Sequence, residues 1–202
     1  MATVYCLGDS LTFGLGVRRQ ERWTGLAEQE TGHHVVNLGC NGDTTGGMLV
    51  RLNRDVLGVA GVRQQQSTVL IMGGSNDIFY SGSATPARAN MGAMLHQTMS
   101  AGLRPVVGIP LPLDPALAPR KWAGVVDFSA AAGLLEEYSR WLQGFADAFS
   151  IQTVDFRADF LDDRGYVRAE LFLDGLHPNG RGHRLMADRL AAFLKTQDGG
   201  SI

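Results

Sequence analysis

A serine, a histidine and an aspartate in two short motifs could together carry out acyl transfer. Gly8-Asp9-Ser10-Leu11 closes the first apolar run of the chain, and Asp174-Gly175-Leu176-His177 lies far downstream. A serine hydroxyl is a poor nucleophile at its own pKa and needs a base within hydrogen-bonding distance. His177 could take that proton and later return it to the leaving group, while Asp174 could accept the other imidazole N–H. These residue types indicate a covalent acyl-serine intermediate.

The two motifs differ in how much information they carry. At roughly 1 in 20 per specified residue, an Asp-x-x-His spacing arises by chance in about every second chain of this length. A four-residue string such as Gly-Asp-Ser-Leu arises in only about one such chain in a thousand. The serine motif therefore leads the interpretation, and the histidine motif corroborates it.

Acyl transfer also requires hydrogen-bond donors for the oxyanion of the tetrahedral intermediate. Three groups are candidates: the backbone N–H of Ser10, the backbone N–H of Gly42 and the side-chain amide of Asn76. Glycine suits such a place because it lets the backbone approach a substrate closely and adopts positive φ. The same Gly-rich loop also offers Gly39.

The elements that must position these residues follow from the apolar periodicity of the chain. Strands are predicted at the β-branched apolar runs, which are Thr3–Leu7, His34–Leu38, Ser67–Met72, Arg104–Ile109 and Ile151–Val154. Helices are predicted between or after them, at Trp23–Glu30, Thr45–Leu57, Ala87–Ala101, Leu134–Phe149 and Arg181–Lys195. Alternating strands and helices predict βαβ units, and hence a three-layer α/β domain around a parallel sheet.

The candidate residues come directly after predicted strands. Ser10 follows the first strand, Gly42 the second and Asn76 the third, while Asp174 and His177 come after the fifth. Sites in open α/β sheets lie at the carboxyl ends of the strands. We therefore expect all of these residues to meet at one edge of the sheet.

The longest irregular stretch, Pro110 to Phe128, follows the fourth strand, and its prolines break any helix. A loop of that length commonly forms a lid or a binding wall. Apolar side chains near the same edge could form a groove for an acyl chain. They are Leu11, Phe13, Phe79, Tyr80, Leu111, Leu113, Leu117, Trp122 and Leu176. Of these, we assign substrate contact to Leu11, Phe79, Leu111, Leu113 and Leu176.

The motifs stand in the order and spacing of a known family pattern. Gly8-Asp9-Ser10-Leu11, Gly42, Gly74-Ser75-Asn76-Asp77 and Asp174-x-x-His177 resemble the four blocks of the GDSL, or SGNH, hydrolase superfamily. The resemblance spans the chain from residue 3 to about residue 195. The chain is similar to the small bacterial lipase/acylhydrolase and thioesterase/lysophospholipase-like esterases of that superfamily.

This resemblance implies a flavodoxin-like fold around a five-stranded parallel sheet. It implies Ser10 as nucleophile and His177 as base, with Asp174 as the third member of the triad. It implies Ser10, Gly42 and Asn76 as the oxyanion donors. Gly42 is favoured over Gly39 because Gly42-Asp43-Thr44 matches the family's Gly-Asp-Thr.

Three polar neighbours of these residues are expected to hold loops in place. Asp9 is expected to hold the turn that carries the serine. Asn37 and Asp77 are expected to form hydrogen bonds between loops.

Length and composition are those of one soluble globular domain over residues 1–202, with a disordered tail from about 197 to 202. Eighteen basic and 20 acidic side chains leave a net charge of -2, so nothing draws the chain to nucleic acid or anionic lipid. No run approaches the ~18 apolar residues of a membrane span, and no basic signal region precedes the first strand. We expect a cytoplasmic protein, in which Cys6 and Cys40 are free thiols.

Cofactor and metal motifs are missing from the sequence. Gly14-Leu15-Gly16 lacks the third glycine of a dinucleotide fingerprint, because position 19 is Arg19, and no phosphate-binding P-loop occurs. There is no His-Glu-x-x-His, and His177 with His183 has no recognised ligand spacing. The sequence therefore predicts no cofactor and no metal.

The sequence predicts a serine esterase or acylhydrolase that acts on small ester substrates with acyl chains. Ester, thioester and lysophospholipid hydrolysis share this mechanism, and the residues do not separate them. One alternative is a carbohydrate O-acetyl esterase of the same superfamily. An alternative of another class is a flavodoxin-like mononucleotide-binding module that uses the Ser10–Gly14 loop, which leaves Asp174 and His177 without a purpose.

Overall fold

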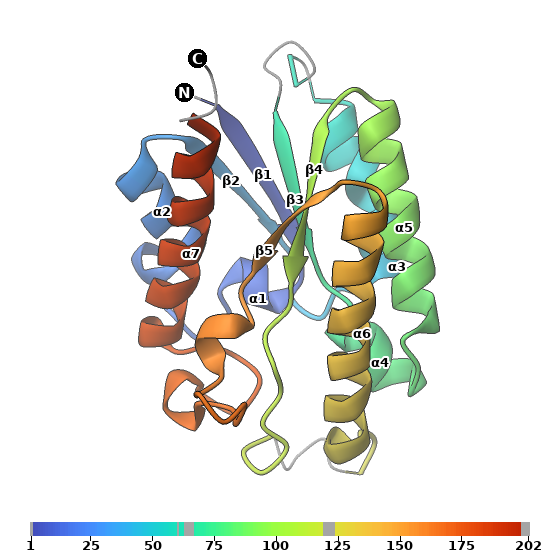
Figure 1. Cartoon of the computed structure of the whole chain (residues 1–202), viewed down its shortest axis with the longest axis vertical. Helices are drawn as coiled ribbons and strands as arrows, with labels where there is room; N and C mark the ends of the chain where they lie inside the picture. Colours follow the sequence, from blue (N-terminus) through green and yellow to red (C-terminus); the bar gives the residue numbers. More distant parts are fainter. Residues whose placement is uncertain (1, 60, 63–66, 119–123, 199–202) are drawn as a thin grey trace.

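The computed structural model describes residues 2–59, 61–62, 67–118 and 124–198, and a parallel sheet lies at its centre (Figure 1). Its strands are β1 (Thr3–Gly8), β2 (His34–Gly39), β3 (Thr68–Met72), β4 (Arg104–Ile109) and β5 (Gln152–Asp155). Their order across the sheet is β2-β1-β3-β4-β5, and each neighbouring pair is parallel. This is the flavodoxin-like order, in which the chain reverses direction across the sheet beside β1. The predicted α/β fold with five parallel strands is confirmed.

Helices cover both faces of the sheet (Figure 1). They are α1 (Ser10–Phe13), α2 (Trp23–Thr31), α3 (Thr45–Leu52), α4 (Ser75–Ser81), α5 (Thr85–Ser100), α6 (Phe128–Ala148) and α7 (Gly180–Asp198). Shorter turns are η1 (Arg19–Glu21), η2 (Asn53–Leu57), η4 (Ala158–Phe160) and η5 (Ala169–Leu171). α2 and α7 pack on one face, whereas α3, α5 and α6 pack on the other.

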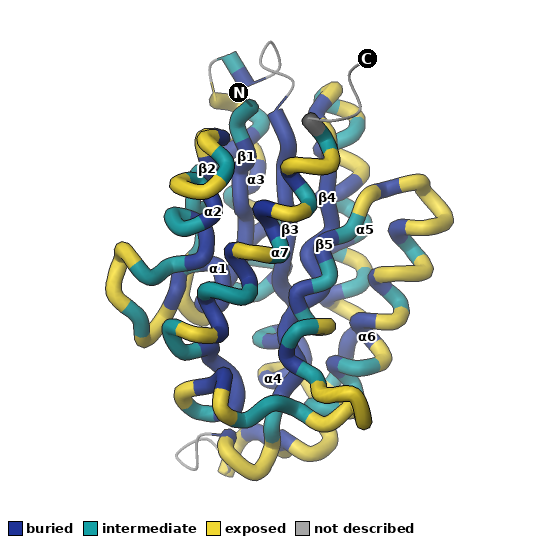
Figure 2. The backbone as a smooth tube through the Cα atoms, turned by 60° about the vertical axis from the view of Figure 1, so that its left-hand side comes forward, coloured by how far each residue is buried: buried dark blue, intermediate teal, exposed yellow. Residues whose placement is uncertain are grey.

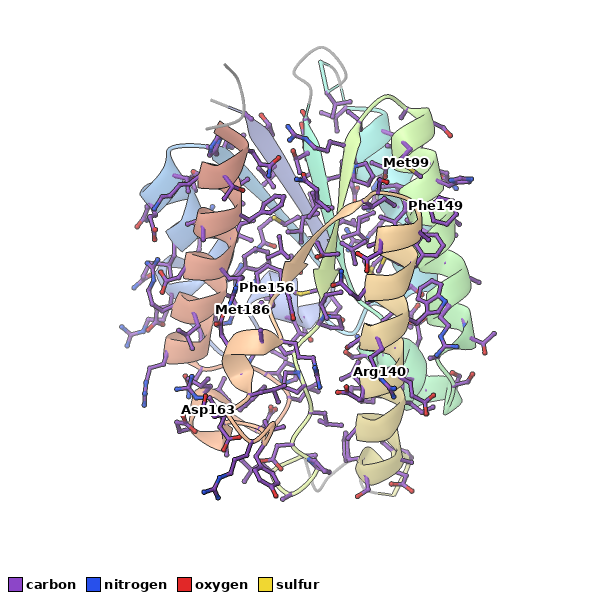
Figure 3. The ribbon with its side chains drawn as sticks, in the orientation of Figure 1. Met99, Arg140, Phe149, Phe156, Asp163 and Met186 are labelled. Atoms are coloured by element: carbon purple, nitrogen blue, oxygen red, sulfur yellow. The ribbon has the colours of Figure 1, made fainter. Side chains whose placement is uncertain are left out.

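The core lies in two layers because successive side chains of a strand point to opposite faces. Val4 and Cys6 of β1 pack in the layer beneath α2 and α7, while Tyr5 and Leu7 pack in the layer beneath α3, α5 and α6. Figure 2 shows the strands as the buried centre between helices whose outer sides are exposed. Figure 3 marks Phe156 and Met186 on the α7 side of the sheet and Met99 on the α5 side.

The structure differs from the predicted elements mainly at short helices and helix ends. α1 and α4 were not predicted, and each begins at a serine shortly after a strand. Asp9 separates Ser10 from β1, and two glycines separate Ser75 from β3. α6 begins at Phe128 rather than Leu134, because the Asp127 carboxylate caps it by accepting the Ala130 N–H at 3.0 Å.

The last helix changes one expectation about the end of the chain. α7 continues to Asp198, whereas the tail was expected from about residue 197, and residues 199–202 lie outside the described residues. Trp122, expected near the site, also lies outside them. Across the ranges that are described, none of the helices has both the length and the apolar character needed to cross a membrane.

Candidate active site

Ser10, His177 and Asp174 meet at the carboxyl edge of the sheet. Ser10 Oγ lies 3.1 Å from His177 Nε2, although the two residues are 167 positions apart in the chain. On the other side of the ring, His177 Nδ1 lies 2.9 Å from Asp174 Oδ2 and 3.2 Å from Asp174 Oδ1. A hydroxyl at this distance from a neutral imidazole nitrogen can give up its proton to it, and the carboxylate can stabilise the resulting imidazolium.

Each residue of the serine motif has a physical role in the turn from β1 into α1. Gly8 permits close packing, since a Cβ there would lie 2.2 Å from Thr12 Oγ1. Asp9 caps α1, because its Oδ1 accepts the Leu11 N–H at 2.9 Å, as predicted. Leu11 anchors the turn, with its side chain 2% exposed and its carbonyl accepting Trp23 Nε1–H at 2.9 Å. The Ser10 hydroxyl is thereby held at the start of a short helix.

The histidine motif forms a tight turn after β5. Asp174 Oδ1 accepts the N–H of Leu176 at 3.1 Å and the N–H of His177 at 2.8 Å. Gly175 has φ +76°, a conformation that L side chains rarely adopt. Its carbonyl accepts the Asp114 N–H at 2.8 Å, which ties the turn to the segment after β4.

The two aspartates differ in acidity. Partial burial raises the pKa of Asp174, but hydrogen bonds from the His177 ring and from two backbone N–H groups outweigh it, so the pKa lies below its ordinary value. Burial raises the pKa of Asp9 to about 6, against the opposing effect of the Leu11 N–H. The carboxyl beside the imidazole therefore stays ionised to a lower pH than the Asp9 carboxyl does.

The three expected oxyanion donors come from neighbouring loops. The Ser10 N–H stands at the first position of α1, where N–H groups have no acceptor within the helix. Gly42 lies in the loop after β2 with φ +73°. Asn76 lies in the first turn of α4, and its Nδ2 donates to the backbone carbonyl of Asp43 at 2.8 Å. One hydrogen bond thus joins the Asn76 side chain to the residue after Gly42.

Gly39 and Gly42 have different surroundings. Gly39 is the last residue of β2, and its N–H donates to Asn37 Oδ1 at 3.0 Å. A Cβ on Gly39 would lie 2.0 Å from the Phe13 nitrogen, so this glycine serves the packing of α1 against β2. Gly42 is exposed in its loop, which agrees with the preference for Gly42 as the candidate donor.

The expected supporting roles of Asn37 and Asp77 are confirmed. Asn37 Nδ2 donates to the carbonyl of Thr12 at 2.7 Å and to Thr24 Oγ1 at 2.9 Å, so it ties β2 to α1 and α2. Asp77 accepts the Thr45 N–H at 2.9 Å and the Thr45 hydroxyl at 2.6 Å, which joins α4 to the start of α3. Both side chains hold the loops that surround the serine.

An apolar hollow of about 340 Å³ adjoins the candidate donor Asn76. Its other lining residues are Phe79 and Tyr80 of α4 and Val125 and Val126 before α6. A larger hollow of about 760 Å³ lies beside the free edge of β2, and neither Ser10 nor His177 lines it. The smaller one is the hollow that a group bound at Asn76 could occupy.

The predicted substrate-contacting residues divide into two groups. Phe79 lines the hollow, as does Tyr80. The side chains of Leu11 and Leu111 are each 2% exposed and pack in the core layer beneath α2 and α7, so they do not line it. Leu113 and Leu176 are also buried, in the same cluster as Phe79 and Val126, and do not line it either. We therefore assign these four leucines to the core.

The other histidine near the site is structural. His183 lies in α7 and is completely buried, and its Nδ1 accepts the Trp23 N–H at 3.4 Å. Burial lowers the pKa of His183 to about 4, so its ring is neutral at pH 7. In the part of the chain that the structure describes, no three His, Cys, Asp or Glu side chains lie close enough to hold a metal ion.

The sequence matches a known hydrolase family. The GDSL-like Lipase/Acylhydrolase family matches residues 6–185, and the chain belongs to this family. It is therefore a GDSL-family hydrolase, and the alternative of a binding module without hydrolase activity is set aside.

Individual proteins resemble the chain in sequence or in fold. Esterase TesA of Pseudomonas aeruginosa is 26% identical over 182 residues, which cover 87% of this chain and 79% of that protein. Est24, a carbohydrate acetylesterase from Sinorhizobium meliloti, shares the fold with a TM-score of 0.80 at 20% identity, covering 98% of this chain and 100% of its own. The M. smegmatis aryl esterase has a TM-score of 0.80 at 19% identity, with 97% and 99% covered.

Sequence reasoning missed two features of the site. Ser75–Ser81 form α4, for which no helix was predicted from the sequence. Gly82 just beyond them, which has φ +63°, is the helix-end signal that the sequence offers. Val125 and Val126 line the hollow, but they fall within an irregular stretch where no periodicity marks them.

Proposed function

We propose that this chain is a serine esterase that forms an acyl-enzyme on Ser10. The observation that carries the proposal is the continuous chain of contacts from Ser10 Oγ to His177 Nε2 at 3.1 Å and from His177 Nδ1 to Asp174 at 2.9 Å. Each member of the chain has a partner at a distance suited to proton transfer or to orientation of the imidazole.

In the first half-reaction, His177 accepts the Ser10 proton while Oγ attacks the ester carbonyl carbon. The tetrahedral intermediate collapses when His177 returns that proton to the leaving alkoxide oxygen, which leaves an acyl-serine and a free alcohol. A water molecule then repeats the sequence and releases the carboxylic acid. Asp174 holds the imidazole in the required tautomer throughout.

The oxyanion of each intermediate would accept hydrogen bonds from Ser10 N–H, Gly42 N–H and the Asn76 amide. A carboxamide carries two N–H groups, so the bond from Asn76 to Asp43 uses one and leaves the second for the oxyanion. Loss of one such donor typically raises the barrier by about 2.7–4 kcal/mol.

Substitution of the serine tests the proposal directly. Ser10→Ala should reduce kcat for p-nitrophenyl butyrate on the order of 10⁶-fold, as loss of a nucleophilic serine does elsewhere. It should also abolish labelling by a fluorophosphonate probe, while the thermal unfolding midpoint stays close to that of the wild type. Ser83→Ala, in a half-buried residue between α4 and α5, is the matched control and should keep full activity. Undiminished turnover by Ser10→Ala would refute the proposal.

The apolar hollow favours an acyl chain as the group transferred. Phe79, Val125 and Val126 contribute apolar side chains beside Asn76, and the Phe79 ring packs edge-on against Phe128 at 5.7 Å between centroids. An acyl group whose carbonyl oxygen is held at Asn76 would bury its chain against these residues. We therefore propose that the enzyme prefers acyl chains over bulky polar acyl groups.

A panel of p-nitrophenyl esters from acetyl to octanoyl tests this preference. Val126→Phe should fill the hollow and lower kcat/KM for octanoyl relative to acetyl by about tenfold or more, because one group of methylene size in an apolar pocket changes rates by 10–200-fold. Val50→Phe, on the exposed side of α3, is the matched control. High activity on acetylated sugars with none on butyryl or octanoyl esters would instead favour the carbohydrate O-acetyl esterase reading.

A further inference from the structure

Arg51 of α3 bonds with all three of its guanidinium nitrogens. Its Nε donates to Asp43 Oδ2 at 2.7 Å, its Nη1 to Asp55 Oδ2 at 3.1 Å and its Nη2 to the backbone carbonyl of Gly8 at 2.7 Å. The side chain is only 12% exposed. A planar guanidinium can serve acceptors in several fixed directions at once, which an ammonium on a flexible stem cannot.

The Gly8 carbonyl connects Arg51 to two of the donor loops. Gly8 is the last residue of β1 and precedes Ser10 by two positions. The same carbonyl accepts the N–H of Cys40, which begins the loop after β2, at 3.0 Å. Arg51 and Cys40 thus bond to the same oxygen, which fixes the start of the Gly42 loop relative to the serine turn.

Asp43 connects Arg51 to the third donor. It directly follows Gly42, and its carboxylate accepts the Arg51 Nε–H while its backbone carbonyl accepts the Asn76 amide at 2.8 Å. One residue therefore joins Arg51 to both Gly42 and Asn76.

We propose that Arg51 is a positioning residue that holds the Ser10, Gly42 and Asn76 donors at the separations the oxyanion requires. This inference rests on the esterase function proposed above. Arg51 acts through the Gly8 carbonyl and through Asp43, and does not itself touch the reacting atoms.

Arg51 also balances charge near the serine. The carboxylates that it pairs with are 12% exposed at Asp43 and 17% exposed at Asp55. The charge of Asp43 already contributes to raising the pKa of Asp9, next to Ser10. Without the guanidinium, this carboxylate would repel the developing oxyanion as well as lose its fixed position.

Two substitutions of Arg51 separate geometry from charge. Arg51→Met should lower kcat for p-nitrophenyl butyrate on the order of 10²-fold, because misplacing the donors resembles removing one of them. Arg51→Lys keeps the charge but cannot reach all three acceptors. Its kcat should therefore fall between that of the wild type and that of Arg51→Met. KM should change little, since the donors act mainly in the transition state. The inhibition constant of a trifluoromethyl ketone, which forms an oxyanion adduct, should rise in proportion to the loss of kcat.

Matched variants distinguish positioning from general stabilisation. Asp43→Asn should lose kcat as Arg51→Met does, because it removes the carboxylate that joins Arg51 to the donor loops. Asp55→Asn removes the charge of the carboxylate that has no link to those loops, and it should stay near wild type. Arg54→Met removes an arginine that bonds the same Asp55 but is 76% exposed, and should keep kcat within about twofold. Thermal midpoints of all variants are measured alongside, and Arg51→Lys carries the test if Arg51→Met does not fold.

Three results would overturn the inference. They are wild-type kcat in both Arg51 variants, equal losses in Asp43→Asn and Asp55→Asn, or a loss of kcat/KM that lies entirely in KM. Ser10→Ala is assayed in parallel. If Ser10→Ala is inactive while the Arg51 variants remain at wild-type rates, only the positioning role fails. If Ser10→Ala retains turnover, the proposed esterase function fails with it.

Discussion

Two aspartates, Asp9 and Asp174, hold the two turns that meet at the site, and their surroundings shift their pKa values in opposite directions. Asp9 is 1% exposed, and its burial raises its pKa to about 6. The Asp174 side chain is 34% exposed, and four hydrogen-bonding contacts with His177 and Leu176 hold its pKa below the ordinary value. Both carboxyl groups accept backbone N–H groups from residues two or three positions later in the chain. An aspartate can therefore hold such a turn whether its pKa is raised or lowered.

The difference shows what each turn requires. The serine turn needs an acceptor for the Leu11 N–H, which a neutral carboxyl also supplies. The histidine turn needs a carboxylate, because a neutral partner would not stabilise the imidazolium. Burial therefore favours the neutral form of the Asp9 carboxyl, whereas partial exposure limits the desolvation of the Asp174 carboxylate.

The largest expected effect is at the histidine turn. Asp174→Asn preserves acceptors for the Leu176 and His177 N–H groups but loses the charge and favours the wrong imidazole tautomer. We expect kcat for p-nitrophenyl butyrate to fall on the order of 10⁴-fold, as in the serine protease triad, with little change in the thermal midpoint. Asp9→Asn should lose far less. Equal losses in the two variants would show that the two turns do not differ as argued.

The next effect concerns stability and pH at the serine turn. The folded pKa of Asp9, about 6, lies above the ordinary value of 3.8, so the stability that this carboxyl contributes is present below pH 4 and is lost as pH rises through 6. Asp9→Asn removes that dependence. The free energy of unfolding of Asp9→Asn relative to wild type should increase between pH 4 and pH 7 by on the order of 3 kcal/mol. Urea unfolding at pH 4, 5.5 and 7 measures it, and a difference that does not change with pH contradicts the prediction.

The smallest effect concerns the glycine beside Asp174. Gly175→Ala places a side chain at φ +76°, with its Cβ 2.5 Å from the Asp114 carbonyl oxygen. We expect a loss of about 1–3 kcal/mol in the free energy of unfolding, measured by urea denaturation. Gly133→Ala, in α6 with open space around its Cβ, is the matched control and should be neutral or slightly stabilising. Equal stability of the two variants would show that the turn adapts to a side chain.

The strands were predictable to within about a residue because a buried parallel strand is a continuous apolar run. Val69 to Met72 of β3, for example, are all completely buried. The short helices were not predictable in the same way. α1 has four residues and α4 has seven, too few to show helical periodicity, so their Ser and Asn residues are typical of a turn until the strand ends are placed in space.

The site residues were predictable because parallel strands deliver their following residues to one edge. That rule brings Ser10, Gly42, Asn76, Asp174 and His177 together without any distance being known. The direction in which each side chain points was not predictable, because it depends on the hydrogen bonds and packing that hold each turn. Leu11 and Leu111 follow strands as the site residues do, yet their side chains turn into the core. Arg51 has no motif around it, and its role depends on contacts with a carbonyl 43 residues away.

The place of β1 between β2 and β3 sets the order in which the molecule can assemble. Neither edge of β1 is paired until residues 34–39 or 68–72 have folded back beside it. Parallel pairing therefore costs loop-closure entropy before the contacts between strands stabilise the chain. The contact between Ser10 and His177 spans 167 positions, so it forms only once the two ends of the domain have come together. During refolding from urea, recovery of hydrolytic turnover should therefore lag behind the return of helical circular dichroism, and it marks the moment at which the whole domain has closed.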